Sequence, residues 1–207
     1  MKEAYIFDMD GTLIDSMPLW QNFGADYLRS LGKEPAPGLR DKTRALSFER
    51  TAECFVEDYQ LDKTVEQVLK EWNEWMIRAY RELPMKKGAL EFLQKNREKT
   101  MVLFTANSGP TTQVIREKFH LDDYFCAFFT ADDVKADKNE PVAFERVCQR
   151  LGVDPQNCTV FEDSLYAMKG AKGAGCKVIA IQDEAFPQEE EAIRVLADRY
   201  VEDFTQI

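Results

Sequence analysis

Two aspartates near the start of the chain have a spacing suited to nucleophilic and acid–base chemistry. Asp8 and Asp10 follow the short apolar run 4–7 and precede Gly11, so they leave the regular pleat where a predicted strand ends. At that spacing one carboxylate can attack an electrophilic centre while its neighbour delivers or takes a proton.

Further polar residues stand where other predicted strands end, or just before a predicted helix. They supply a hydroxyl with turn amides, a lysine, and a second pair of carboxylates: Thr105, Ala106 and Asn107; Lys138; Glu162 and Asp163. We expect them to gather at one edge of the fold with the first two aspartates, because carboxyl ends of parallel strands meet at one edge of a sheet.

Carboxylates that converge in this way repel one another, which raises their pKa values and destabilises the fold. A bound dication relieves the repulsion, and oxygen ligands in a small site favour Mg²⁺. Together with a lysine and with hydroxyl and amide donors, Mg²⁺ can position a phosphoryl group and neutralise its charge. Ordinary surface carboxylates would not be expected to follow successive strands in this order.

The elements that must position these residues are short apolar runs alternating with segments of helical length and period. Abrupt polar ends and a lack of alternation are typical of strands buried on both faces. The predicted strands are 4–7, 101–104, 126–129, 159–161 and 178–181, with an edge strand within 198–207. The predicted helices between them are 88–98, 109–119, 140–151 and 164–174. This order predicts an α/β fold, a Rossmann-like doubly wound parallel sheet.

One stretch interrupts the alternation, because residues 17–83 contain no strand-like run. Apolar residues from Val65 to Ala79 lie on one helical face, and 19–31 and 48–59 are also predicted helices. We therefore predict an α/β core made of 1–16 and 84–207, with an all-helical domain at 17–83 inserted after the first strand.

Composition excludes several classes of protein. The 207 residues carry 27 Lys and Arg against 37 Asp and Glu, a net charge of −10 that disfavours binding to nucleic acid. No apolar run reaches the roughly 18 residues that a membrane span requires. The five cysteines form no C-x-x-C pair, and the N-terminus has no signal-like apolar region. We expect a cytoplasmic protein with reduced thiols that binds neither nucleic acid nor membrane.

These motifs, in this order, resemble those of the haloacid dehalogenase-like phosphohydrolase superfamily. The resemblance covers essentially the whole chain and points to the branch with a helical cap, which includes phosphoglycolate phosphatases and β-phosphoglucomutase-like proteins. Its four motifs stand here as Asp8-Met9-Asp10-Gly11-Thr12, Thr105, Lys138 and Glu162-Asp163. The family implies a mobile cap that closes over the substrate.

The resemblance implies roles for the carboxylates. Asp8 would be the nucleophile and a metal ligand, and Asp10 the general acid/base, with its backbone carbonyl on the metal. Asp163 would complete the protein ligands of Mg²⁺. Glu162 would not ligate the ion directly, but would contact its ligands or act through a water molecule.

It also implies a binding site for the phosphoryl group. Thr105, helped by the amides of Ala106 and Asn107, would hold the phosphoryl oxygens, and Lys138 would neutralise charge. The expected function is Mg²⁺-dependent hydrolysis of a small phosphorylated metabolite through an aspartyl-phosphate on Asp8, by a monomer or weak homodimer. The chain departs from the family at Asn139, where proline is common, and at Ala167, where glycine is common.

Two alternatives stay open. A β-phosphoglucomutase-like phosphosugar mutase shares the fold and motifs, but such mutases have a cap loop of basic residue, Gly, any residue, Ser and Arg. The nearest match, 44–48, ends in Phe48 where arginine is expected. A non-catalytic binding or regulatory module is disfavoured by the presence of Asp8, Asp10 and Lys138.

The substrate is not defined by these motifs, and phosphosugars, phosphoglycolate and nucleotides are all compatible with them. Specificity should come from cap side chains that close over the leaving group. The candidates are Asn22, Arg40, Lys42, Arg44 and Arg50.

Overall fold

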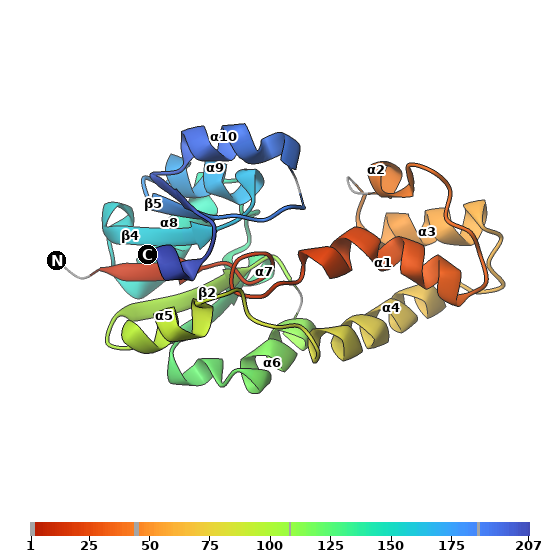
Figure 1. Cartoon of the computed structure of the whole chain (residues 1–207), viewed down its shortest axis with the longest axis horizontal. Coiled ribbons are helices and arrows are strands. Elements are labelled where there is room, and N and C mark those ends of the chain that lie inside the picture. Colours follow the sequence, from red (N-terminus) through yellow and green to blue (C-terminus); the bar gives the residue numbers. More distant parts are fainter. Residues whose placement is uncertain (1–2, 44–45, 108, 186) are drawn as a thin grey trace. The chain divides into compact units, whose positions relative to one another are not determined.

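The computed structural model describes residues 3–43, 46–107, 109–185 and 187–207. The chain divides into two compact units, one formed by Met1–Met17 with Leu83–Ile207 and the other by Pro18–Glu82. Figure 1 shows the course of the chain through both units.

The first unit contains a six-stranded parallel sheet in the order β3-β2-β1-β4-β5-β6. Its strands are β1 (Ala4–Phe7), β2 (Thr100–Thr105), β3 (Ala127–Thr130), β4 (Cys158–Glu162), β5 (Lys177–Ile181) and β6 (Arg199–Val201). The predicted α/β fold with a parallel sheet is confirmed, and the strand predicted near the C-terminus is edge strand β6. The chain order reverses at β1, and such a reversal opens a crevice at the carboxyl ends of the strands.

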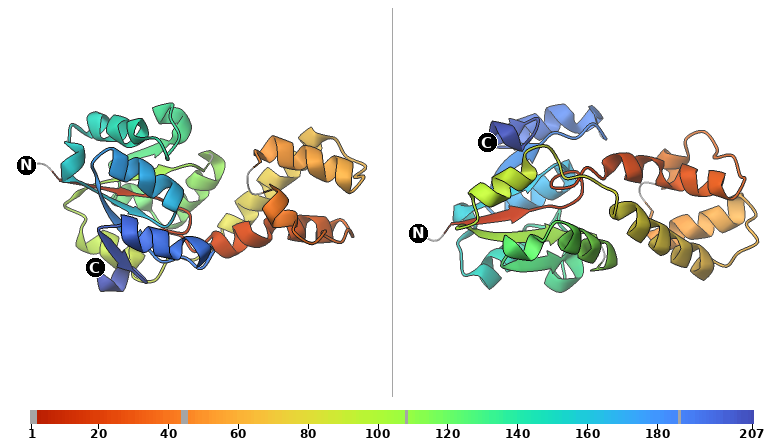
Figure 2. Two further views of the ribbon diagram at one scale, coloured as in Figure 1. Left: turned by 90° about the horizontal axis from the view of Figure 1, so that it is seen from above. Right: turned by 60° about the horizontal axis from the view of Figure 1, so that its bottom comes forward.

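Helices lie on both faces of this sheet (Figures 1 and 2). They are α5 (Ala89–Lys95), α6 (Gly109–Lys118), α7 (Ala131–Val134), α8 (Pro141–Leu151), α9 (Leu165–Gly173) and α10 (Glu190–Leu196). Short 3₁₀ turns are η1 (Leu121–Asp123), η2 (Pro155–Asn157), η3 (Pro187–Glu189) and η4 (Phe204–Gln206). Each predicted helix of this unit is present, although α5 ends three residues before the predicted boundary at 98.

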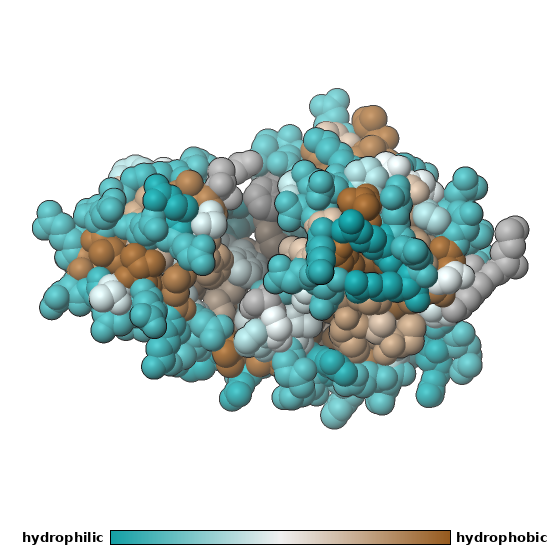
Figure 3. Space-filling view, turned by 180° about the vertical axis from the view of Figure 1, so that it is seen from behind, coloured by the Kyte–Doolittle hydropathy of each residue, from teal (hydrophilic) through white to brown (hydrophobic). Residues whose placement is uncertain are grey.

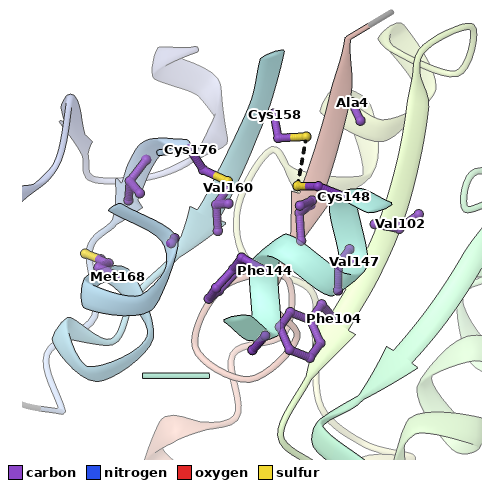
Figure 4. Close-up of a cluster of buried hydrophobic side chains, with 14 of the residues drawn as sticks. Ala4, Val102, Phe104, Phe144, Val147, Cys148, Cys158, Val160, Met168 and Cys176 are labelled. Atoms are coloured by element: carbon purple, nitrogen blue, oxygen red, sulfur yellow. Dashed lines mark hydrogen bonds between the residues drawn. The ribbon is translucent and has the colours of Figure 1, made fainter. Parts of the chain in front are cut away.

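Both faces of β1 are buried, which explains its uninterrupted apolar sequence. Ile6 belongs to a cluster with Phe104 of β2 and with Phe144 of α8, part of which is drawn in Figure 4. On the opposite face, Phe7 stacks on Phe161 of β4 with ring centroids 4.4 Å apart. The strand that carries Asp8 is thus fixed from two sides at the centre of the sheet.

The second unit is all-helical. Its helices are α1 (Met17–Ser30), α2 (Leu39–Thr43), α3 (Phe48–Asp58) and α4 (Val65–Tyr80). Trp72 lies in the interior of this unit, because it is 1% exposed and meets Phe23, Tyr27 and Phe55 edge-on. Helix α2 was not predicted, since five residues are too few to show a helical period.

The surface seen in Figure 3 is mostly hydrophilic, as expected for a chain of net charge −10. Among the described helices, none is both long and apolar enough to cross a membrane.

The glycine-rich run after β4 brings a helix close to the backbone of another segment. This run, residues 170–175, contains three glycines, and α9 ends within it at Gly173. Gly170, however, lies inside α9, where an added Cβ would be 2.1 Å from the carbonyl oxygen of Lys138. Hydrogen in place of a side chain therefore lets α9 support the loop that presents Lys138.

We expect Gly170→Ala to lower the melting temperature by several degrees. Overpacking against backbone costs about 1–3 kcal/mol, and each kcal/mol shifts the midpoint by about 2–4 °C in a chain of this size. Differential scanning calorimetry measures the shift. The control is Gly109→Ala in α6, where an added Cβ meets no described atom within 4 Å; equal effects of the two changes would contradict the close approach.

Candidate active site

Asp8 continues β1 beyond its last residue. Its backbone N–H donates to the carbonyl oxygen of Phe161 at 3.0 Å, so the carboxylate emerges where β1 and β4 end side by side. A tight turn follows, in which Gly11 has a φ of +80° and donates its N–H to the carbonyl oxygen of Ile14. This turn takes Asp10 out of the sheet, as its spacing predicted.

The turn also approaches Asp163 closely. A Cβ on Gly11 would lie 2.2 Å from Asp163 Oδ2, so position 11 requires glycine for space as well as for backbone conformation. Next to it, the Thr12 hydroxyl donates to Asp163 Oδ1 at 3.3 Å. Thr12 stands within the first motif, but no role was predicted for it, because its contact with a residue 151 positions away depends on tertiary structure.

Lys138 lies between two carboxylates. Its Nζ donates to Asp8 Oδ1 at 2.5 Å and to Glu162 Oε2 at 2.6 Å, and the residue is only 5% exposed. The other oxygen of Glu162, Oε1, accepts the backbone N–H groups of Asp163 and Ser164. Both Glu162 oxygens are therefore engaged by the protein, which makes Glu162 a support for Lys138 and for the loop after β4.

Electrostatics in this cluster are dominated by burial. Burial, with the charge of Glu162 next in importance, raises the pKa of Asp8 to about 8, although Lys138 opposes the shift. Burial and the charges of Glu162 and Asp8 also raise the pKa of Asp163. For Lys138, burial alone would lower the pKa, but Asp8 and Glu162 outweigh it and the pKa is raised. The cluster holds more negative charge than one ammonium group balances, so it takes up protons or a further cation.

The donor set suits a small, hard cation. Oxygens of Asp8, Glu162 and Asp163 lie within 4.8 Å of one another, and all three residues are buried. Carboxylate oxygens without nitrogen or sulfur ligands are typical of Mg²⁺ and Ca²⁺ sites. Because Glu162 is occupied by Lys138 and two amides, Asp8 and Asp163 are the side chains best placed to ligate.

At the end of β2, Thr105 and Asn107 form a second polar group. The Asn107 backbone N–H donates to Thr105 Oγ1 at 3.0 Å, and its Nδ2 donates to Asp10 Oδ2 at 3.0 Å. Only the backbone amide of Asn107 was predicted to contribute, and the contact of its side chain with Asp10 was not predicted.

A cavity of about 270 Å³ joins these groups within the α/β unit. The eight residues predicted for catalysis, phosphoryl binding and metal binding all line it: Asp8, Asp10, Thr105, Ala106, Asn107, Lys138, Glu162 and Asp163. Tyr166, which sequence analysis did not select, also lines the cavity and is 51% exposed. The cavity brings a buried lysine, a hydroxyl and several carboxylates together around a volume suited to a small anionic group.

The specificity candidates in the helical unit have local partners. Lys42 pairs with Asp58 and Arg50 with Glu53, while Asn22 Nδ2 donates to the carbonyl oxygen of Pro18. Arg40 also makes an interaction. Arg44 lies outside the described residues.

Comparisons with known proteins identify the family. The model of haloacid dehalogenase-like hydrolases matches residues 2–175, and the chain belongs to that family of enzymes. It is 31% identical to a phosphorylated carbohydrates phosphatase of Thermotoga maritima, over 86% of this chain and 83% of the relative. It is 26% identical to a fructose-1-phosphate phosphatase of Escherichia coli, over 88% of this chain and 99% of the relative.

A solved structure from Thermotoga maritima, provisionally described as a β-phosphoglucomutase, is similar over nearly the whole length. Its TM-score is 0.79 at 26% identity, with 96% of this chain and 94% of that chain covered. The family resemblance inferred from the motifs is confirmed.

Removing the ammonium group should destabilise the fold in a pH-dependent way. We expect Lys138→Met, in the presence of a chelator, to lose about 3–5 kcal/mol of unfolding free energy at pH 8, because buried carboxylates are left without a counterion. The loss should be smaller at pH 5. Carboxyl groups whose folded pKa exceeds the unfolded value bind protons on folding, so stability falls as pH rises. Urea denaturation at both pH values measures the difference.

The matched control is Lys172→Met, which removes a lysine from the partly exposed pair with Asp198. Such a pair contributes less than about 1 kcal/mol, and we expect no change in its effect between pH 5 and 8. A Lys138→Met effect equal at both pH values would show that packing, and not charge, explains the loss.

Proposed function

We propose that the protein is a Mg²⁺-dependent phosphatase that hydrolyses a small phosphate monoester through an aspartyl-phosphate on Asp8. The observation that carries this proposal is the position of the Asp8 carboxylate, held by Lys138 in the same cavity as Asp10 and Thr105. Residues 17–83 would form the cap that closes over the substrate.

In the first step, a carboxylate oxygen of Asp8 attacks phosphorus and the bond from phosphorus to the ester oxygen breaks. Asp10 gives a proton to the leaving oxygen, so that an alcohol departs. Lys138, whose pKa is raised by its two carboxylate neighbours, stays charged and reduces repulsion between the Asp8 carboxylate and the anionic substrate.

In the second step, Asp10 takes a proton from a water molecule whose oxygen attacks the aspartyl-phosphate. Inorganic phosphate leaves and the Asp8 carboxylate is restored. Thr105, Ala106 and Asn107 line the cavity and would hold phosphoryl oxygens by hydroxyl and amide donors.

Mg²⁺ would be held by Asp8 and Asp163, with the Asp10 carbonyl as the family resemblance implies. When bound, it neutralises charge on phosphoryl oxygens. Thr12 would fix the orientation of Asp163 through its hydrogen bond to Oδ1.

We further propose a phosphorylated sugar or sugar-like alcohol as the substrate. Two relatives that align over more than four-fifths of both chains are named for phosphorylated carbohydrates and for fructose 1-phosphate. Phosphoglycolate and nucleotides are the comparison substrates.

A mutase acting within a phosphosugar is the second candidate, favoured by the similarity to the structure described as a β-phosphoglucomutase. The position expected to carry arginine in such mutases is Phe48, which begins α3 and packs its ring against Trp20, Phe23 and Trp72. Ser47 caps the same helix by accepting the Arg50 N–H. Phe48 thus contributes to aromatic packing at the position where a mutase would carry its arginine, and this favours the hydrolase over the mutase.

Phosphorus NMR of the protein with Mg²⁺ and a panel of phosphate esters tests the proposal. We expect inorganic phosphate to grow fastest from sugar phosphates, with none formed by Asp8→Asn, because the variant lacks the attacking oxygen. Movement of phosphate from one sugar position to another would instead identify a mutase. Phosphate release by Asp8→Asn would exclude Asp8 as the nucleophile.

Thermal melts with Mg²⁺ test the metal site without turnover. At a Mg²⁺ concentration 100 times Kd, stabilisation is about 2.7 kcal/mol, or a rise in Tm of roughly 5–10 °C. The rise should be larger at pH 8 than at pH 6, because with a pKa of about 8 Asp8 must release a proton to bind metal at the lower pH.

Asp163→Asn should lose most of this Tm shift. Asp198→Asn, which alters the partly exposed ion pair with Lys172, should retain it. An unchanged Tm for the unaltered protein would favour the non-catalytic module over the enzyme.

A further inference from the structure

Helix α6 contributes a buried hydroxyl that contacts the site through another side chain. Thr111, in the first turn of α6, is 3% exposed, and its Oγ1 donates to Asn107 Oδ1 at 2.9 Å. Asn107 Nδ2 in turn donates to Asp10 Oδ2 at 3.0 Å. A chain of hydrogen bonds thus runs from Thr111 through one carboxamide to Asp10.

Contacts with three of the described residues hold Asn107. Its backbone N–H is held by Thr105, the oxygen end of its side chain by Thr111, and the nitrogen end by Asp10. A carboxamide has unlike ends, and only the nitrogen end can donate to an ionised carboxylate. Anchoring the oxygen end on α6 keeps the donating end directed at Asp10.

We propose that Thr111 is a positioning residue that sets the orientation of the Asp10 carboxylate through Asn107. The inference rests on the proposed function, in which Asp10 transfers the proton. Thr111 is not among the residues that line the described cavity, so the route proposed for it runs through Asn107.

Orientation matters here because a general acid must lie within hydrogen-bond reach of the oxygen it protonates. Without the hydroxyl, the carboxamide can rotate about its side-chain bonds, and the Asp10 carboxylate can follow it. A displacement of about 1 Å at a reacting group can cost roughly 10²-fold in rate. An effect transmitted through one intervening side chain should be smaller, on the order of tenfold.

The first test compares Thr111→Val, which preserves shape without the hydroxyl, with Thr111→Ser, which preserves the hydroxyl. We expect Val to lower kcat by about tenfold with KM within about twofold, and Ser to keep at least about half of kcat. The matched control is Thr112→Val, the same change at the next buried position of α6, which should leave kcat unchanged. Equal losses for Val and Ser at position 111 would overturn the proposal.

A double-mutant cycle shows whether the effect passes through Asn107. In the Asn107→Ala background, Thr111→Val should lower kcat by no more than about twofold, because the intermediary is already gone. If the threonine change costs the same factor in both backgrounds, Thr111 acts by another route and the proposal fails.

Side-chain amide signals of Asn107 in ¹⁵N–¹H spectra report the link without turnover. We expect their protons to exchange faster with solvent in Thr111→Val than in the unaltered protein or in Thr111→Ser. Identical exchange in all three would refute the hydrogen-bonded chain even in an active enzyme. If the unaltered protein releases no phosphate but its Asn107 amide protons still exchange more slowly than those of Thr111→Val, the proposed function is refuted. The hydrogen bond from Thr111 to Asn107 is then still supported.

Discussion

One ammonium group holds the active-site edge of this molecule together. Lys138 Nζ bridges Asp8 at the end of β1 and Glu162 at the end of β4, and it lies 5.3 Å from the centre of the Phe104 ring. Around it, the folded chain buries several carboxylates, and burial together with their mutual repulsion raises the pKa values of Asp8 and Asp163. Because these carboxylates carry more negative charge than one ammonium group balances, the cluster favours the uptake of protons or of a small cation.

Close backbone approach makes this arrangement possible. Gly11 lets the turn after β1 lie against Asp163, and Gly170 lets α9 lie against the carbonyl of Lys138. Behind these contacts, the stacked rings of Phe7 and Phe161 fix the two central strands relative to each other. The positions of the charged atoms are thus set by apolar packing and by the two glycines, which leave room for close backbone contacts, as well as by the charges themselves.

Much of this fold could be predicted because β1, β2, β4 and β5 are largely buried and form short apolar runs in the sequence. The site could be predicted because parallel strands end at one edge, so residues after β1, β2 and β4 had to meet there. Hydrogen-bond partners could not be predicted. Glu162 has the same chemistry as Asp163, and only the folded chain shows that its two oxygens are taken by Lys138 and two amides.

Thr111 was missed for a related reason. A threonine in a helix has no periodic signal, and its role depends on which side chain lies beside it after folding. Helix α2 was missed because local signals in five residues are weak, and the preceding Pro35 and Gly38 favour a loop. The role of Thr111 thus depends on long-range geometry, whereas α2 was missed because its local signal is weak.

The central place of β1 has a consequence for how the chain is made. Phe7 pairs with Leu103 and Phe161, so β1 is synthesised well before the strands with which it pairs, β2 and β4. At about 5–20 residues per second, translation reaches the end of β4 roughly 10–30 s after Asp8. Pro18–Glu82, whose contacts are local, can fold during that interval, whereas the pairing of β1 with β4 must close a long loop. Until translation has passed residue 138, Asp8 therefore lacks Lys138, and until it has passed residue 163 it lacks the carboxylate pair at the end of β4, so the cluster is completed late in synthesis.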